Sequence, residues 1–287
     1  DLSDVTILQP MRHNMLGWLK TLPLNYVTQG EDVIIRNPAL LSEKVGVVSL
    51  ATSAAIELAL SRTHAAFGEW SATTVTVRAE LLQKLADIIE LKRDELIALC
   101  CKEAGKVIAD GVAEVREAVD FCRYYAASTV SGDFAAKNLQ PRGVVLCISP
   151  WNFPLAIFLG QVTAALAAGN TVIAKPAEQT CLIALRCLEL MREIGFPEGV
   201  MELLIAEGPV IGETVVPDLR IKAVMFTGST ETGAWIARRL ALRSDAPIPL
   251  VAETGGQNCM LVDSTALPEQ VVDDVITSGF QSAGQRC

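Results

Sequence analysis

The stretch Gly-Val-Val-Leu-Cys-Ile-Ser-Pro-Trp-Asn-Phe-Pro at residues 143–154 is an apolar run that ends at a turn between two prolines. An unbroken apolar run is typical of a parallel strand that is buried on both faces. The residues after it predict a helix at 155–168, ended by Gly169 and Asn170, and a second strand at 171–175. A strand, a helix and a strand in this order form a right-handed crossover, which places the two strands parallel in one sheet.

The alternation of strands and helices continues beyond this unit. We expect further strands at 200–206, 221–226 and 248–252, separated by helices at 180–194, 210–216 and 231–243. Five strands joined by helical crossovers indicate an α/β fold with a doubly wound parallel sheet. Ligands of such sheets bind at the carboxyl ends of the strands, so the residues that follow each strand are candidates for a site.

The first half of the chain has a different character. Pro10, Pro23 and Pro38 interrupt every long element in residues 1–50, and we therefore expect an irregular N-terminal segment. Leucine and isoleucine recur at spacings of three and four between residues 78 and 103, and residues 51–127 are predicted to be helical.

Composition argues against several classes of protein. The 287 residues carry 24 Lys and Arg against 33 Asp and Glu, and this net charge of −9 disfavours nucleic acid and anionic membranes as main partners. A hydrophobic content of 51% excludes intrinsic disorder. No apolar run reaches the roughly 18 residues of a membrane span. With 2 His and 8 scattered Cys we expect no metal site. Scattered cysteines in a chain of this size are expected to be reduced thiols, which indicates a cytoplasmic location.

Two of the strand ends carry residues suited to binding or stabilising negative charge. Residues 226–233 read Phe-Thr-Gly-Ser-Thr-Glu-Thr-Gly, a glycine turn that opens a helix and so suits a phosphate. This is not the dinucleotide fingerprint, and an ordinary strand-to-helix turn explains it equally well. Asn152 lies between two prolines and is placed to donate to an oxyanion, although a rigid loop with Trp151 packed inside is the simpler interpretation.

Three further stretches carry charged or nucleophilic side chains. Lys175 and Glu178 could hold ribose hydroxyls or form a solvated ion pair. Glu253 follows a predicted strand and could act as a general base, or be only a charged residue beside a glycine turn. Cys287 follows Arg286, whose positive charge favours the thiolate form of the cysteine. Taken alone, however, Cys287 is more simply interpreted as an inert thiol.

The combination is more specific than any single stretch. Pro-Trp-Asn-Phe-Pro, Lys-Pro-Ala-Glu, Phe-Thr-Gly-Ser-Thr, Glu-Thr-Gly-Gly and Gly-Gln-Arg-Cys, in this order, resemble the motifs of the aldehyde dehydrogenase superfamily. The resemblance runs from about residue 37 to residue 287. The sequences of residues 251–258, 266–270 and 282–287 look most like the Δ1-pyrroline-5-carboxylate dehydrogenase domain of bifunctional proline utilization A proteins. Phe-Cys-Arg-Tyr-Tyr at 121–125 agrees with this resemblance.

The resemblance implies a set of residue roles. The Cys287 thiolate would attack the aldehyde carbon, Asn152 would stabilise the oxyanion, and Glu253 would activate the water that hydrolyses the thioester. The cofactor would be NAD, bound by Ile148, Trp151, Lys175, Glu178, Gly228, Ser229 and Gly233. The substrate would be L-glutamate semialdehyde, the open form of Δ1-pyrroline-5-carboxylate, and the product L-glutamate. The alternatives are another small semialdehyde or, for this chain by itself, a nucleotide-binding module with an incomplete active site.

The resemblance also implies the organisation of the protein. We expect an aldehyde dehydrogenase-like, Rossmann-like fold in which residues 1–50 precede an NAD-binding domain at 51–252. Residues 128–142 would serve oligomerisation, and residues 253–287 would begin a catalytic domain. Family members continue well beyond the cysteine, so the chain is expected to be a fragment that is inactive alone. The complete protein is expected to form a homo-oligomer and to have a neighbouring proline dehydrogenase domain.

Overall fold

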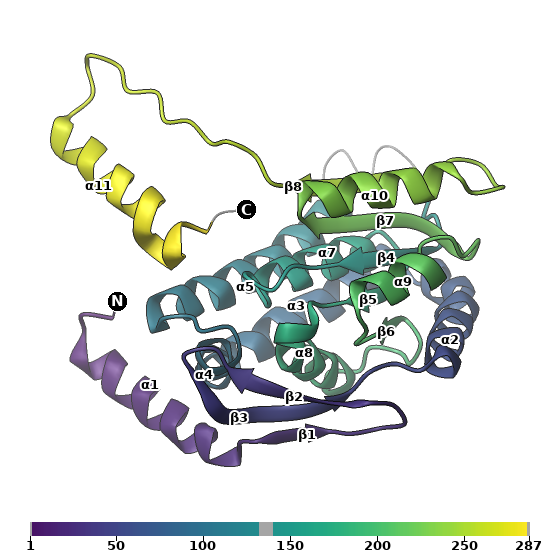
Figure 1. Cartoon of the computed structure of the whole chain (residues 1–287), viewed down its shortest axis with the longest axis horizontal. Helices are drawn as coiled ribbons and strands as arrows, with labels where there is room; N and C mark the ends of the chain where they lie inside the picture. The colour runs from purple at the N-terminus through teal and green to yellow at the C-terminus, as the bar shows by residue number, and fades with distance from the viewer. Residues whose placement is uncertain (1, 132–139, 286–287) are drawn as a thin grey trace.

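A five-stranded parallel sheet forms the centre of the computed structural model, which describes residues 2–131 and 140–285 (Figure 1). The strand order is β6-β5-β4-β7-β8. The strands are β4 (Val144–Ile148), β5 (Thr171–Lys175), β6 (Met201–Leu203), β7 (Ile221–Gly228) and β8 (Leu250–Thr254). The chain moves outward from β4 to β6, then returns to add β7 and β8 on the other side. The predicted doubly wound α/β sheet is therefore confirmed. The point at which the strand order reverses lies between β4 and β7.

The register of the sheet brings the strand ends together. Ile148 at the end of β4 pairs with Lys175 of β5 and with Phe226 of β7. Thr227, the next residue of β7, pairs with Glu253 of β8. The residues that follow β4, β5, β7 and β8 consequently share one edge of the sheet.

Helices cover both faces of this sheet. Four of them follow strands: α7 (Ala156–Ala167), α8 (Cys181–Glu193), α9 (Gly208–Thr214) and α10 (Thr230–Ala241). Four precede the sheet and confirm the predicted helical region: α2 (Ser53–Ala72), α3 (Val75–Leu91), α4 (Arg93–Glu103) and α5 (Ile108–Val130). Val145 and Cys147 of β4 face the core built by α3, α5, α7 and α8, while Val144 and Leu146 face the core beneath α2, α9 and α10. This alternation is the two-residue period of a strand buried on both sides.

Buried charges hold both ends of helix α7. At its N-terminus, Glu114 of α5 accepts hydrogen bonds from the backbone amides of Leu155 and Ala156, at 3.2 and 2.9 Å. At its C-terminus, the Arg78 Nε donates to the carbonyl of Ala167 at 3.1 Å. Each charge has the sign that the helix dipole favours at that end. Helix α7 is therefore fixed along its axis, and so is the turn that leads into it from β4.

The N-terminal segment is not irregular, and that prediction was wrong. Residues 5–49 form helix α1 (Val5–Trp18), a short 3-10 turn (Leu19–Thr21) and a sheet of order β1-β3-β2, with β1 (Leu24–Tyr26), β2 (Asp32–Asn37) and β3 (Leu40–Ser49). Pro23 lies just before β1 and Pro38 in the turn between β2 and β3, where the Asn37 side chain accepts from the amide of Ala39 at 2.9 Å. Two of the three prolines thus separate elements instead of abolishing them. Pro10 lies inside α1, whose Met11 and Met15 are buried in the core.

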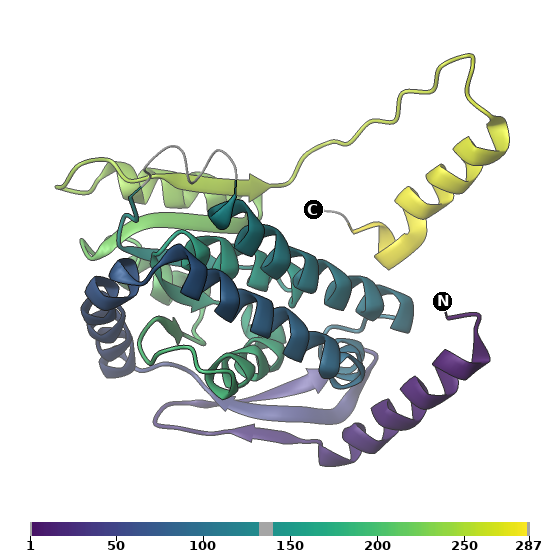
Figure 2. The same ribbon diagram turned by 180° about the vertical axis from the view of Figure 1, so that it is seen from behind.

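The C-terminal part leaves the sheet. After β8, which spans the expected domain boundary at 252/253, the chain extends to helix α11 (Pro268–Phe280) and a 3-10 turn (Gln281–Gly284). In Figures 1 and 2 this yellow arm stands apart from the five-stranded sheet, and its end approaches the first turns of α5. No residue of α11 is buried. Within the expected oligomerisation segment, residues 132–139 lie outside the described residues.

Candidate functional site

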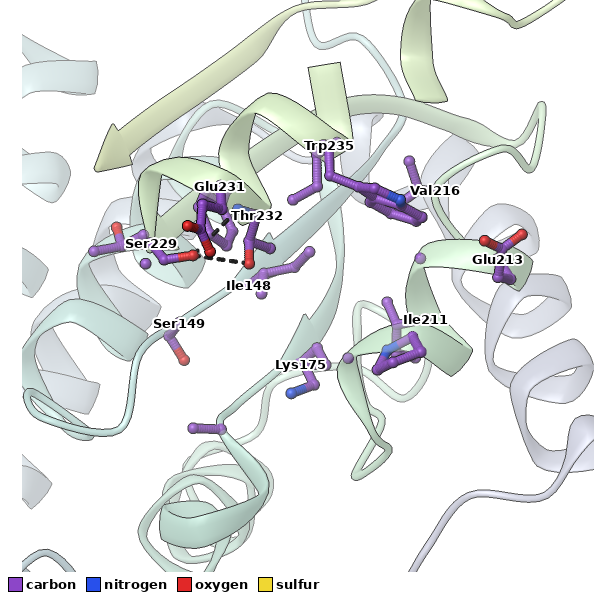
Figure 3. A pocket seen from close by; sticks show the side chains of 18 of the residues that line it. Ile148, Ser149, Lys175, Ile211, Glu213, Val216, Ser229, Glu231, Thr232 and Trp235 are labelled. Carbon is purple, nitrogen blue, oxygen red and sulfur yellow. Dashed lines mark hydrogen bonds between the residues drawn. The ribbon is translucent and has the colours of Figure 1, made fainter. Parts of the chain in front are cut away.

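A cleft of about 660 Å³ opens at the edge of the sheet where the winding reverses (Figure 3). Residues from the ends of β4, β5 and β7 line it, together with residues of α9 and α10. Both the position and the size are typical of a small-molecule site in a doubly wound sheet. The sequence predicted this edge because the candidate motifs follow successive strands.

One end of the cleft is the N-terminus of helix α10. Ser229 caps the helix: its Oγ accepts from the backbone amide of Thr232 at 3.1 Å and lies 2.9 Å from the Thr232 hydroxyl, as the dashed lines in Figure 3 show. Gly228 directly before it ends β7 and also lines the cleft. The free amides and the dipole of a helix N-terminus favour an anionic group such as a phosphate.

The floor of the cleft carries two polar groups. Lys175 is buried at the end of β5, and its Nζ lies 2.6 Å from Glu178 Oε2. The Ser149 hydroxyl is buried and has no hydrogen-bond partner among the described residues. A buried hydroxyl of this kind normally bonds to something, so Ser149 marks a place where a ligand or water supplies a partner. Sequence reasoning missed Ser149, although its position directly after β4 was the available signal.

The wall of the cleft is apolar. It is lined by Trp235 and Ile236 of α10, by Ile211 of α9 and by Val216. Gly212 lies directly against the Trp235 ring, and a Cβ at this position would collide with it. Glycine therefore lets α9 approach the Trp235 ring closely.

The structure places the predicted cofactor residues in three groups. Ile148, Lys175, Gly228 and Ser229 line the cleft. Trp151 and Glu178 lie next to it: Trp151 is 49% exposed in the turn after β4, and Glu178 contacts the cleft through its ion pair with Lys175.

Gly233 lies elsewhere. Its side-chain position faces β8, where a Cβ would come within 2.8 Å of the Thr254 Cγ2 and 3.4 Å of the Phe226 ring. It is one turn into α10, on the face that packs against the sheet. In this structure Gly233 allows α10 to pack closely on the sheet, and it is not among the residues that line the cleft.

The predicted catalytic residues are only partly described. Asn152 is half-buried in the turn after β4, and Glu253 is exposed on β8, so the two lie at the same edge of the sheet. Cys287 and its neighbour Arg286 lie outside the described residues. Among the residues that are described, no group of three His, Cys, Asp or Glu is placed to hold a metal ion.

A buried glutamine connects the cleft to Glu253. The Gln161 Nε2 of α7 donates to the carbonyl of Ile148 at 3.2 Å and to the hydroxyl of Thr227 at 3.0 Å, and so links the ends of β4 and β7. Gln161 also lines a smaller cavity of about 220 Å³ together with Glu253. This residue too was missed from the sequence, since it lies in the middle of an otherwise apolar helix.

Comparisons with known proteins agree with this geometry. The model described as "Aldehyde dehydrogenase family" matches residues 26–287. The bifunctional protein PutA of Salmonella typhimurium is 50% identical over 264 residues, which cover 91% of this chain and 20% of that protein. The 1-pyrroline-5-carboxylate dehydrogenase of Anoxybacillus flavithermus is 36% identical over 272 residues, covering 90% of this chain and 53% of that protein.

A solved structure shows the same similarity in three dimensions. The 1-pyrroline-5-carboxylate dehydrogenase from Thermus with bound NAD superimposes with a TM-score of 0.93 at 32% identity, over 99% of this chain and 60% of that one. The chain thus spans about half the length of the dehydrogenases it matches and about a fifth of the bifunctional protein. No helix in the described residues has both the length and the apolar character needed to cross a membrane.

Proposed function

The chain belongs to the aldehyde dehydrogenase family, and from this we propose that it carries the NAD site and part of the catalytic site of an enzyme that oxidises L-glutamate semialdehyde to L-glutamate. One observation carries the proposal. The motifs after β4, β5, β7 and β8 lie at one edge of the sheet, where the ends of β4, β5 and β7 line a cleft of about 660 Å³. The similarity to proteins named PutA and 1-pyrroline-5-carboxylate dehydrogenase supports the choice of substrate and a role in proline catabolism.

The cleft suits NAD in three respects. The N-terminus of α10, with Gly228 and Ser229, favours the pyrophosphate. Lys175 and Glu178 would bond to ribose hydroxyls, and the apolar wall beside Trp235 would receive the adenine ring. Ile148 and Trp151 would border the remainder, and Gly233 would act through the placement of α10. When bound, NAD accepts the hydride that leaves the substrate.

The residues of the chain would then carry out the chemistry at the aldehyde carbon. The Cys287 thiolate adds to that carbon to form a thiohemiacetal, whose oxyanion is stabilised by the Asn152 amide and the Cys287 backbone amide. Loss of hydride leaves a thioester on Cys287. Glu253 takes a proton from water, the hydroxide adds to the thioester, and the C–S bond breaks to release the carboxylic acid and the Cys287 thiolate.

We propose the wider context on the same basis. The name "Bifunctional protein PutA" of these relatives supports a covalent neighbour domain, to which we assign proline dehydrogenase activity. We also propose a cytoplasmic location and assembly into a homo-oligomer. Analytical ultracentrifugation of the whole protein would measure the assembly directly.

The test is NADH formation by the whole protein with L-glutamate semialdehyde and NAD, beside a Cys287→Ala variant. We expect the signal to vanish in the variant while NAD binding, measured by fluorescence titration, is retained. A signal that survives in the variant would refute the role of Cys287. If the wild type binds NAD but gives no signal, other small semialdehydes are tried next, and failure with all of them would favour a nucleotide-binding module without this activity.

A further inference from the structure

A buried lysine lies beneath the turn that carries Asn152. Lys106 follows helix α4, where Gly105 adopts a left-handed conformation (φ of 68°) and turns the chain toward the interior. The Lys106 side chain is only 5% exposed. Burying an ammonium group is unfavourable unless it is paired, so the groups around Lys106 define what it does.

The first partner is the glutamate that holds helix α7. The Lys106 Nζ lies 3.5 Å from Oε1 of Glu114, whose side chain is 2% exposed. The other carboxylate oxygen of Glu114 accepts from the amides of Leu155 and Ala156, the residues that directly follow the Asn152 turn. Glu114 thus ties the Lys106 charge to the start of α7.

The second partner belongs to the turn itself. The Lys106 Nζ lies 4.3 Å from the centre of the Phe153 ring, a cation–π contact in a buried place. Phe153 is the residue next to Asn152. The direction in which the turn presents the Asn152 amide therefore depends on the group beneath it.

The third partner comes from the far end of the chain. The Lys106 Nζ donates to the Ser282 hydroxyl at 3.1 Å, and Gln281 beside it donates to Asp110 of α5 at 3.4 Å. These contacts join the segment before Cys287 to the same buried centre, although 176 positions separate Lys106 from Ser282.

We propose that the buried Lys106–Glu114 pair is a positioning element, which holds the Asn152 turn in the orientation needed to stabilise the oxyanion and fixes the Ser282 segment against it. The proposal rests on the proposed function. A buried ion pair is often no more stabilising than apolar side chains of the same size, so stability alone is a poor reason for one here. The pair instead contacts both the turn that carries Asn152 and the segment that precedes Cys287, and this position explains its presence as a geometric support for the two proposed catalytic residues.

The experiment compares Lys106→Met with Lys102→Met in the whole protein. Methionine keeps the apolar stem and removes the charge. Lys102 lies on α4 and forms an ion pair of 2.8 Å with Glu43, but it is partly exposed and away from the Asn152 turn. We expect Lys106→Met to lower kcat by about 10²-fold, because small displacements of reacting groups have effects of this size. The Kd for NAD should stay within about twofold, and Lys102→Met should behave as wild type.

A double-mutant cycle separates positioning from general stability. Asn152→Ala by itself should lower kcat by about 10²–10³-fold. If Lys106 acts through Asn152, adding Lys106→Met to Asn152→Ala lowers kcat little further, since the group to be positioned is already gone. Losses that simply multiply, or a Lys106→Met variant with wild-type kcat, would overturn the proposal.

A second variant covers the case in which Lys106→Met does not fold. The double substitution Lys106→Met/Glu114→Gln removes both charges, keeps an acceptor for the amides of α7, and still removes the contacts to Phe153 and Ser282. A folded double variant with kcat near wild type overturns the proposal, and a loss near 10²-fold supports it. A wild-type protein without NADH formation refutes the proposed function and this inference with it, whereas an active wild type with an unaffected Lys106 variant refutes only the inference.

Discussion

The centre of the sheet and its β8 edge are built from strands of similar length in very different surroundings. All of β5, and β4 up to Ile148, are buried beneath helices. In β8 the four residues from Val251 to Thr254 are exposed, and the apolar residues of α11 that follow, among them Val275 and Phe280, have no cover from the described part of the chain.

The difference separates two kinds of site residue. Lys175 is buried at the end of β5, and Gly228 and Ser229 join β7 to helix α10 at the cleft. Glu253 lies on β8, which pairs with β7 and packs against α10, and the Glu253 side chain is exposed beside one small cavity. We therefore expect cofactor binding to depend on the centre of the sheet, and hydrolysis of the thioester to depend on its edge.

The largest effect that would sharpen this comparison is expected at Glu253. Glu253→Gln should reduce steady-state turnover to near zero, because an amide does not take the proton from water. The side chain is exposed here, so stability and the Kd for NAD should be unchanged. A rapid-mixing experiment that shows about one NADH per site and then stops would locate the block at hydrolysis. Steady-state turnover close to wild type would exclude Glu253 as the base.

A buried carboxylate at the centre of the molecule should show the opposite behaviour, with effects on stability and none on chemistry. Glu103 of α4 accepts hydrogen bonds from the amides of Leu182 and Ile183 at the start of α8, at 2.6 and 3.0 Å. Burial raises the pKa of Glu103 from 4.5 to about 8. The folded state therefore binds more protons than the unfolded state between these two values, and the free energy of unfolding falls as the pH rises through that range.

Glu103→Gln should flatten this dependence. Each unit of the pKa difference corresponds to about 1.4 kcal/mol, so the slope between pH 5 and pH 8 is measurable by urea unfolding. Glu80→Gln, on the exposed face of α3, is the matched control and should keep the wild-type slope. Glu114, whose pKa burial also raises, still contributes part of the slope in both variants. An unchanged slope in Glu103→Gln would show that Glu103 is ionised in the folded protein.

The same contrast explains what the sequence could predict. Strands such as β4 and β5 were found because burial on both faces requires an unbroken apolar run, and the site edge followed from the order of strands. The N-terminal sheet was missed because its prolines resemble breaks, when Pro23 and Pro38 in fact separate elements. Hydrophobic periodicity also does not show which strands pair with one another.

The polar residues that hold the site could not be identified from the sequence either. Glu114 and Lys106 meet the Asn152 turn from positions about forty residues earlier, and Gln161 bridges two strands from within an apolar helix. Each looks like an ordinary surface residue in the sequence, and only the tertiary fold shows that it is buried. The motifs therefore gave the candidate chemistry, while the groups that position it required the structure.

The smallest expected effect lies where the two regions meet, at the packing of α10 on β8. Gly233→Ala would place a Cβ within 2.8 Å of Thr254 Cγ2, and we expect it to destabilise the fold by about 1–3 kcal/mol as an overpacked contact. Gly68 is also inside a helix, but has no neighbour within 4 Å, so Gly68→Ala should stabilise by about 0.5–1 kcal/mol. Opposite shifts in the midpoint of urea unfolding would confirm that β8 is firmly packed on α10 despite its exposed face. A neutral Gly233→Ala would mean that β8 moves away freely, and that the edge carrying Glu253 is held even more loosely than its pairing with β7 indicates.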